Sequence, residues 1–171
     1  MRYVLVTLFI FFANLSNAQS FVNYKDTINN FSINIPVGWK FGIPVKYPTI
    51  KLIAYRMPLN ASDTSKDNFN INIIETSNLN LDKTYSRFLE SLQRTDNFTI
   101  INQGDTLING KSYKWLIETH NEADLIKLHN YDFLTYYNDK TYILTLVTFS
   151  YRFASIKNMF LKIAESLILT D

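Results

Sequence analysis

Residues 31–39, FSINIPVGW, predict a half-buried strand that stops abruptly. Apolar residues alternate with Ser32 and Asn34, which is the period-two pattern of a strand with one apolar face. Pro36 has no N–H group to donate, so it is expected to end the hydrogen-bonded ladder. This stretch therefore places the edge of an apolar core at residues 36–39.

The corner formed by Pro36, Gly38 and Trp39 favours a tight turn. Pro36 at the second turn position, followed by Gly38, suits a type I turn. Trp39 would then swing back and close the open end of the core, hiding apolar area beside the turn. The alternative is that Trp39 lines a cleft beside the proline-containing segment 43–48.

The preceding residues complete a hairpin with this strand. A turn at Asn29-Asn30, residues that tolerate positive φ, would pair Tyr24 with Ile35. Asp26 would then be the one charged residue on the apolar side. One apolar and one polar face are typical of a half-buried antiparallel pair.

Further strands are expected in residues 50–57 and 69–76, followed by a helix with Asn80 as its N-cap. Strands are then expected in residues 98–104, 105–120, 125–137 and 141–150, followed by a closing helix. The apolar stripes of the two helices comprise Leu81, Tyr85, Phe88, Leu89 and Leu92, and then Phe153, Ile156, Phe160, Ile163, Ala164, Leu167 and Ile168. This order predicts an α+β fold in which a mainly antiparallel sheet is sandwiched by two amphipathic helices. No internal repeat or linker divides residues 19–171, so we expect a single domain there.

Residues 1–18 have the three parts of a secretory signal peptide. Arg2 gives a positive start, residues 4–13 give an apolar run shorter than the roughly 20 residues that span a bilayer, and small residues end at Ala18. We therefore expect cleavage between Ala18 and Gln19 and export to the periplasm or the extracellular space.

Composition excludes several classes of function. The chain has no cysteine, which excludes disulfides, thiolate metal sites, a cysteine nucleophile and a lipid-modified cysteine anchor. With 17 basic and 15 acidic residues, the formal net charge of +2 gives no electrostatic case for binding nucleic acid or an anionic membrane. We expect a protein that is neither membrane-embedded nor lipid-anchored.

The order of these segments resembles the PsbP-like superfamily, which also takes in the Ran-binding Mog proteins and the bacterial DcrB-like proteins. The residues that carry the resemblance are IPVGW, FNINIIET, NLDKTYSRFLESL, GDTLINGKSYKWLIET, the aromatic hairpin YDFLTYYNDKTYILTLVTFS and the ending IAESLIL. The resemblance covers about residues 21–170. It implies a sheet sandwiched by helices, usually without catalysis, in a protein that serves as an accessory or binding subunit.

Residues 117–124, IETHNEAD, are the most suggestive polar cluster. Glu118 and His120 project to one face of a strand, and Glu122 could join them if the strand continues. Two carboxylates with an imidazole could hold a divalent metal ion. The alternative is a hairpin that turns at Glu122-Ala123 and places Glu118 opposite Lys127 and His120 opposite Leu125. In that register His129 lies opposite Leu116, well away from His120, and the cluster is an ordinary cross-strand charge pair.

Two other features are compatible with binding. The aromatic residues Tyr131, Phe133, Tyr136, Tyr137 and Tyr142 either present a contact surface or fill the core with alternate members. The polar loop Asn60–Asp67 is either a recognition loop or mobile chain.

No motif of a known catalytic class is present in the sequence. The leading hypothesis is therefore an exported, soluble, non-catalytic accessory or binding module without a cofactor, whose partner is an unidentified protein or small ligand. The alternatives are a metal-binding module that uses Glu118 and His120, and a hydrolase with carboxylate chemistry.

The signal-peptide hypothesis predicts the mass of the mature protein. Protein isolated from the exported fraction of its own host should begin at Gln19, as measured by native mass spectrometry under gentle conditions. A chain that retains residues 1–18 would contradict the predicted cleavage.

Overall fold

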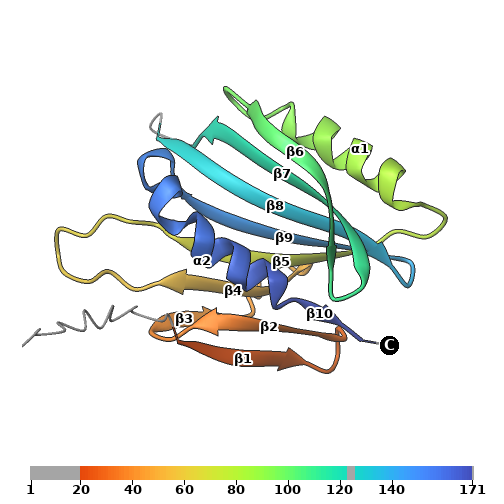
Figure 1. Ribbon diagram of the computed structural model, residues 1–171, viewed down its shortest axis with the longest axis horizontal. Helices are drawn as coiled ribbons and strands as arrows, with labels where there is room; N and C mark the ends of the chain where they lie inside the picture. The colour runs from red at the N-terminus through yellow and green to blue at the C-terminus, as the bar shows by residue number, and fades with distance from the viewer. Residues whose placement is uncertain (1–19, 123–125, 171) are drawn as a thin grey trace, which may run out of the picture.

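Two antiparallel sheets and two helices make up the structure (Figure 1). The computed structural model describes residues 20–122 and 126–170. The larger sheet has the spatial order β3 (Trp39–Gly42), β4 (Ile50–Arg56), β5 (Asn68–Glu75), β9 (Lys140–Phe149), β8 (Lys127–Tyr137), β7 (Lys111–Asn121) and β6 (Thr99–Ile108). The smaller sheet has the order β1 (Phe21–Asp26), β2 (Phe31–Pro36) and β10 (Ile168–Leu169). The helices are α1 (Leu81–Leu92) and α2 (Phe153–Glu165), and a 3-10 turn, η2 (Ser150–Arg152), precedes α2.

The two helices cover opposite faces of the larger sheet. Leu134 of β8 lies beneath α1, whereas Tyr131 of the same strand contacts Phe153 of α2 with ring centroids 6.3 Å apart. Residues 131 and 134 point to opposite sides of a strand because side chains alternate. The predicted α+β architecture, with a mainly antiparallel sheet between two helices, is confirmed. Within the described residues, no helix has the length and hydropathy needed to cross a bilayer.

The hydrophobic core lies on the α2 face of the larger sheet. The smaller sheet packs beside α2 on this face, and its strand β2 contributes three buried side chains. The best-buried core residues come from both sheets and from α2, and comprise Phe31, Ile33, Ile35, Leu52, Phe69, Ile71, Tyr113, Leu144, Leu146, Phe160 and Ile163. The α1 face therefore supplies a smaller share of the apolar burial.

The first hairpin differs from the predicted register by two residues. Tyr24 pairs with Ile33 instead of Ile35, and Asp26 pairs with Phe31. The carboxylate of Asp26 accepts hydrogen bonds from the backbone N–H of Ile28 and from the backbone and side chain of Asn29, at 2.7–2.9 Å. Asp26 thus organises a longer turn, which explains a charged residue on the apolar side and leaves Ile28 88% exposed.

The corner after β2 needs a glycine. Gly38 has a φ of +87°, a left-handed conformation that favours glycine over other residues. Trp39 is buried and packs against Phe69, with ring centroids 6.1 Å apart. It also begins β3, which is not among the strands expected from the sequence.

Two further boundaries were predicted wrongly. Gly104 lies inside a continuous β6, because the indole of Trp115 on the paired strand crosses directly above it. The closing helix ends at Glu165, and Ile168 belongs to β10, which pairs with β2. The backbone N–H of Asn34 donates to the Ser166 hydroxyl at 2.9 Å, which fastens this chain end to the smaller sheet.

Helix α1 begins as predicted but is only partly buried. The Asn80 side chain caps it by accepting from the backbone N–H of Lys83 at 2.9 Å. Thr84 is its one buried residue, and the predicted apolar stripe is half-buried. The helix therefore leaves part of the sheet beneath it accessible.

The close approach of Trp115 to Gly104 predicts the effect of a side chain there. A Cβ at residue 104 would lie 2.9 Å from an indole carbon, so Gly104→Ala should lower the free energy of unfolding by about 1–3 kcal/mol. Urea unfolding monitored by circular dichroism measures the change. Gly42→Ala is the matched control, because nothing lies within 4 Å of a Cβ there, and it should shift stability by less than about 0.5 kcal/mol. Equal effects of the two substitutions would contradict the packing argument.

Candidate functional site

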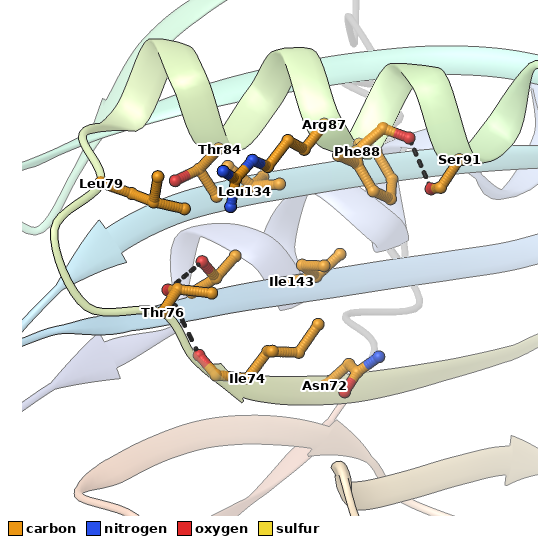
Figure 2. A pocket seen from close by; sticks show the side chains of 11 residues that line it. Asn72, Ile74, Thr76, Leu79, Thr84, Arg87, Phe88, Ser91, Leu134 and Ile143 are labelled. Atoms are coloured by element: carbon orange, nitrogen blue, oxygen red, sulfur yellow. Dashed lines mark hydrogen bonds between the residues drawn. The ribbon is translucent and has the colours of Figure 1, made fainter.

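A cleft of about 360 Å³ lies between α1 and the strands β5, β8 and β9. We call it the α1 cleft, and it is lined by Asn72, Ile74, Thr76, Leu79, Thr84, Arg87, Phe88, Ser91, Leu134, Thr141 and Ile143 (Figure 2). The helix packs mainly on β7 and β8, so the cleft opens along the side of α1 that faces β9 and β5.

The walls of the α1 cleft are mostly apolar. Ile74 and Ile143 form the side provided by the sheet, and Phe88 reaches down from the helix (Figure 2). The hydroxyls of Thr76 and Thr141 lie 2.7 Å apart at one end and satisfy each other. These side chains therefore offer apolar contact rather than a constellation of reactive groups.

Arg87 is the one charged residue among those that line the α1 cleft. Figure 2 shows its side chain running back along the helix, with the guanidinium beside Thr84 and above Leu134. Within the described residues, no acidic group pairs with this guanidinium. The cleft is thus an apolar surface with a single unpaired positive charge.

Glu118 and His120 lie outside the α1 cleft, on the same face of β7. Glu118 is fully buried, and Nδ1 of His120 lies 3.0 Å from both of its carboxylate oxygens. This hydrogen bond raises the pKa of His120, while burial of the ring opposes the effect. The two residues form a close pair in which a buried carboxylate fixes the orientation of an imidazole.

The predicted cross-strand partners of this pair are wrong. Glu118 pairs with Asn130 and His120 with Leu128, instead of Lys127 and Leu125. The connection is longer than a two-residue turn, since the backbone N–H of Glu122 bonds to the Ile126 carbonyl. The predicted turn residue Ala123 lies outside the described residues.

The two histidines point to opposite faces. His129 stacks on Phe153 of α2 with ring centroids 3.7 Å apart, so it cannot join His120. In residues 20–122 and 126–170, no group of three or more His, Cys, Asp or Glu side chains is arranged to hold a metal ion. A metal centre at Glu118 and His120 therefore gains no support from the geometry.

Asp132 is a second buried carboxyl on the same face, on β8. It accepts a hydrogen bond from the Thr145 hydroxyl at 2.6 Å, and its other oxygen has no partner within the described residues. Burial raises the pKa of Asp132 to about 7. Neither Asp132 nor Glu118 lines the α1 cleft, so the carboxylate chemistry of a hydrolase is not directed there.

A separate cluster of charges surrounds Asp67, which sequence reasoning placed only in a polar loop. Asp67 is fully buried and accepts hydrogen bonds from Arg56, Arg152 and Thr148 at 2.6–3.1 Å. Burial alone would raise the pKa of Asp67, but the bonds from Arg152 and Thr148 hold it below its ordinary value. Asp63 forms a bidentate pair with Arg56, so the middle and the end of the loop are both tied to β4.

Trp39 borders a cleft of about 620 Å³ beside this cluster. Arg56 and Arg152 line the cleft, yet each is already paired with aspartate. These contacts join residues up to 85 positions apart, and no local pattern could have revealed them. The cluster's two positive and two negative charges balance, which favours a structural role.

The aromatic residues of the β8–β9 hairpin divide between the two sides. Tyr131, Phe133 and Tyr142 are buried in the core. Tyr136 instead donates its hydroxyl hydrogen to Asp139 at 2.7 Å. The run therefore presents no continuous aromatic surface.

The PsbP family's sequence profile matches residues 19–169. The chain belongs to the PsbP family. Among curated proteins, a comparison of the sequence finds no match.

Solved structures of PsbP-like proteins share the fold at low sequence identity. Cyanobacterial PsbP (CyanoP) from Synechocystis sp. PCC 6803 is 18% identical, with a TM-score of 0.68 over 91% of this chain and 95% of that one. The Saccharomyces cerevisiae Ran-binding protein Mog1p is 11% identical, with a TM-score of 0.60 over 90% and 97%. LpqN of Mycobacterium tuberculosis, involved in cell envelope biogenesis, is 12% identical, with a TM-score of 0.57 over 92% and 88%. The predicted PsbP-like resemblance is confirmed.

The burial of Asp132 predicts a pH dependence of stability. Its pKa of about 7 in the folded protein lies above the ordinary 3.8, so the unfolded chain loses this proton at lower pH. The free energy of unfolding should therefore fall between about pH 4 and pH 7, by roughly 4 kcal/mol at 1.36 kcal/mol per pKa unit. Asp132→Asn should match the wild type near pH 4 and exceed its stability above pH 7, as measured by urea unfolding.

Asp105→Asn is the control for this measurement. It makes the same chemical change at an exposed carboxylate that pairs with Lys114, and it should leave the shape of the pH dependence unaltered. If Asp132→Asn is no more stable than the wild type at high pH, Asp132 is not a destabilising buried charge.

Proposed function

We propose that the protein is an exported, non-catalytic binding module and that the α1 cleft holds a segment of a protein partner. The segment would present a large apolar side chain beside an acidic group. The observation that carries this proposal is the unpaired guanidinium of Arg87 at a mostly apolar cleft.

Charge and apolar contact would act together in such a site. An apolar side chain that enters the cleft removes Ile74 and Phe88 from water, at about 25 cal/mol per Å² of apolar surface buried. An acidic group beside it would pair with Arg87, which fixes orientation and favours one partner over others. A basic group in its place would be repelled.

The shape of the cleft favours a protein segment over an isolated lipid-like molecule. Ile74 and Arg87 both remain exposed, so the cleft is open along one side. An isolated alkyl chain would leave much of its surface in water there. A side chain that belongs to a folded partner keeps the rest of its surface within that partner.

The comparisons and the N-terminal sequence support the proposal. Mog1p, which shares the fold, is described as Ran-binding, and LpqN as involved in cell envelope biogenesis. Residues 1–18 have the pattern of a secretory signal peptide. An exported binding role is consistent with each of these features.

Site-specific photo-crosslinking in the host tests the proposal. A photoreactive residue at Ser91, which lines the α1 cleft, should form one defined product with a partner protein. The matched position is Ser86, an exposed serine of the same helix that also donates to a backbone carbonyl but does not line the cleft. It should form no such product.

Charge reversal distinguishes docking at the α1 cleft from chance proximity. Arg87→Glu should remove most of the crosslinked product, because the acidic group of the partner would then be repelled. Arg94→Glu makes the same charge change outside the cleft and should leave the product unchanged. Absence of product at Ser91, or equal products at both serines, would overturn the proposal.

A further inference from the structure

A further pocket, of about 220 Å³, lies on the α1 face of the larger sheet, at the opposite end of β8 and β9 from the α1 cleft. We call it the polar pocket. Its polar lining comprises Lys66, Asn68, His120, Glu122 and Asn130, and its apolar lining comprises Leu128 and Val147. It shares no residue with the α1 cleft.

We propose that the polar pocket binds a neutral, polyhydroxylated molecule of monosaccharide size. The inference rests on the side chains of His120 and Asn130 and is independent of the partner proposed for the α1 cleft.

The amide of Asn130 gives the first reason to expect a ligand. Asn130 is only 7% exposed, and its side-chain oxygen has no hydrogen-bond partner within the described residues. This oxygen is out of reach of a ligand, whereas the amide nitrogen is not among the fully buried atoms and has no partner in the same residues. A hydroxyl group of a ligand can accept a hydrogen bond from this nitrogen.

His120 gives the second reason. Nδ1 of His120 lies 3.0 Å from the carboxylate oxygens of Glu118, and this contact fixes the plane of the imidazole ring. Nε2 of His120 has no protein partner among the described residues. A hydroxyl can either donate to Nε2 or accept from it, so it suits both protonation states of the imidazole. The pocket thus offers two oriented hydrogen-bonding groups on neighbouring strands.

The charges of the polar pocket favour a neutral ligand. His120 is compensated by the buried carboxylate of Glu118, and the Lys66 ammonium lies 3.7 Å from the carboxylate of Glu122. No unpaired ionic group among the lining residues would favour an anion or a cation. In this respect the polar pocket differs from the α1 cleft, where Arg87 is unpaired.

Size and apolar lining agree with one sugar ring. The volume corresponds to about seven waters at roughly 30 Å³ each, which is room for one small molecule. Leu128 and Val147 offer an apolar patch against which the C–H groups of a sugar ring can pack. Amide, imidazole and apolar contacts together suit a molecule that carries both hydroxyls and C–H faces.

Nuclear magnetic resonance titration of the folded wild-type protein tests this inference. The probes are glucose, galactose, mannose and N-acetylglucosamine, together with glucuronate and glucosamine as charged forms of the same ring. At least one neutral sugar should bind with millimolar affinity and shift the side-chain signals of Asn130 and His120. Glucuronate and glucosamine should bind more weakly than the neutral sugar.

Two variants localise the binding. Asn130→Leu should weaken the affinity at least tenfold, and His120→Gln should also weaken it. Asn72→Leu makes the same change as the first variant on the same sheet face but outside the polar pocket, and it should retain binding. Circular dichroism confirms that each variant is folded.

The outcomes separate the ligand classes. No binding by any neutral sugar, or shifts confined to other parts of the protein, would overturn the inference. Stronger binding of glucuronate or glucosamine would show that the pocket selects a charged ligand, which also contradicts it. None of these results depends on the crosslinking at Ser91.

Discussion

The two faces of β8 carry different kinds of side chain, and the layers that pack on the two faces differ accordingly. Tyr131 and Phe133 point toward α2 and the smaller sheet and are buried in one continuous core. Asn130, Asp132 and Leu134 alternate with them on the other face, where α1 packs. Because side chains alternate along a strand, a single strand can anchor an apolar core on one side and carry polar groups on the other.

The apolar packing and the proposed binding sites consequently lie in different layers. The α2 face has the apolar packing, and the Asp67 cluster ties its loops together with compensated charges. The α1 face has a helix with one buried residue, a cleft with an unpaired Arg87, and the oriented pair Glu118 and His120. Buried side-chain atoms without a hydrogen-bond partner in the described residues occur on both faces: Asn72, Asn130 and Asp132 on the α1 face, and Tyr113, Thr119 and His129 on the α2 face.

Local patterns revealed most of the elements but not all of their pairings. The strand of residues 31–36 and the cap at Asn80 follow from alternation and side-chain chemistry within a few residues. The register of the first hairpin could not be predicted because Asp26 folds back onto its own turn, which lengthens it. The contact between Asp67 and Arg152 joins distant segments, and the α1 cleft exists only because the helix covers part of the sheet. Sites built from tertiary placement leave no local signal in the sequence.

Hydrogen exchange would test most directly whether the α1 face is the binding face. The mature protein would be compared alone and in an extract of the host's exported fraction, with backbone exchange followed by mass spectrometry. If a partner binds the α1 face, protection should increase in α1, β5 and β9 and stay unchanged in α2 and the smaller sheet. Protection confined to α2 or to the smaller sheet would contradict binding at the α1 face.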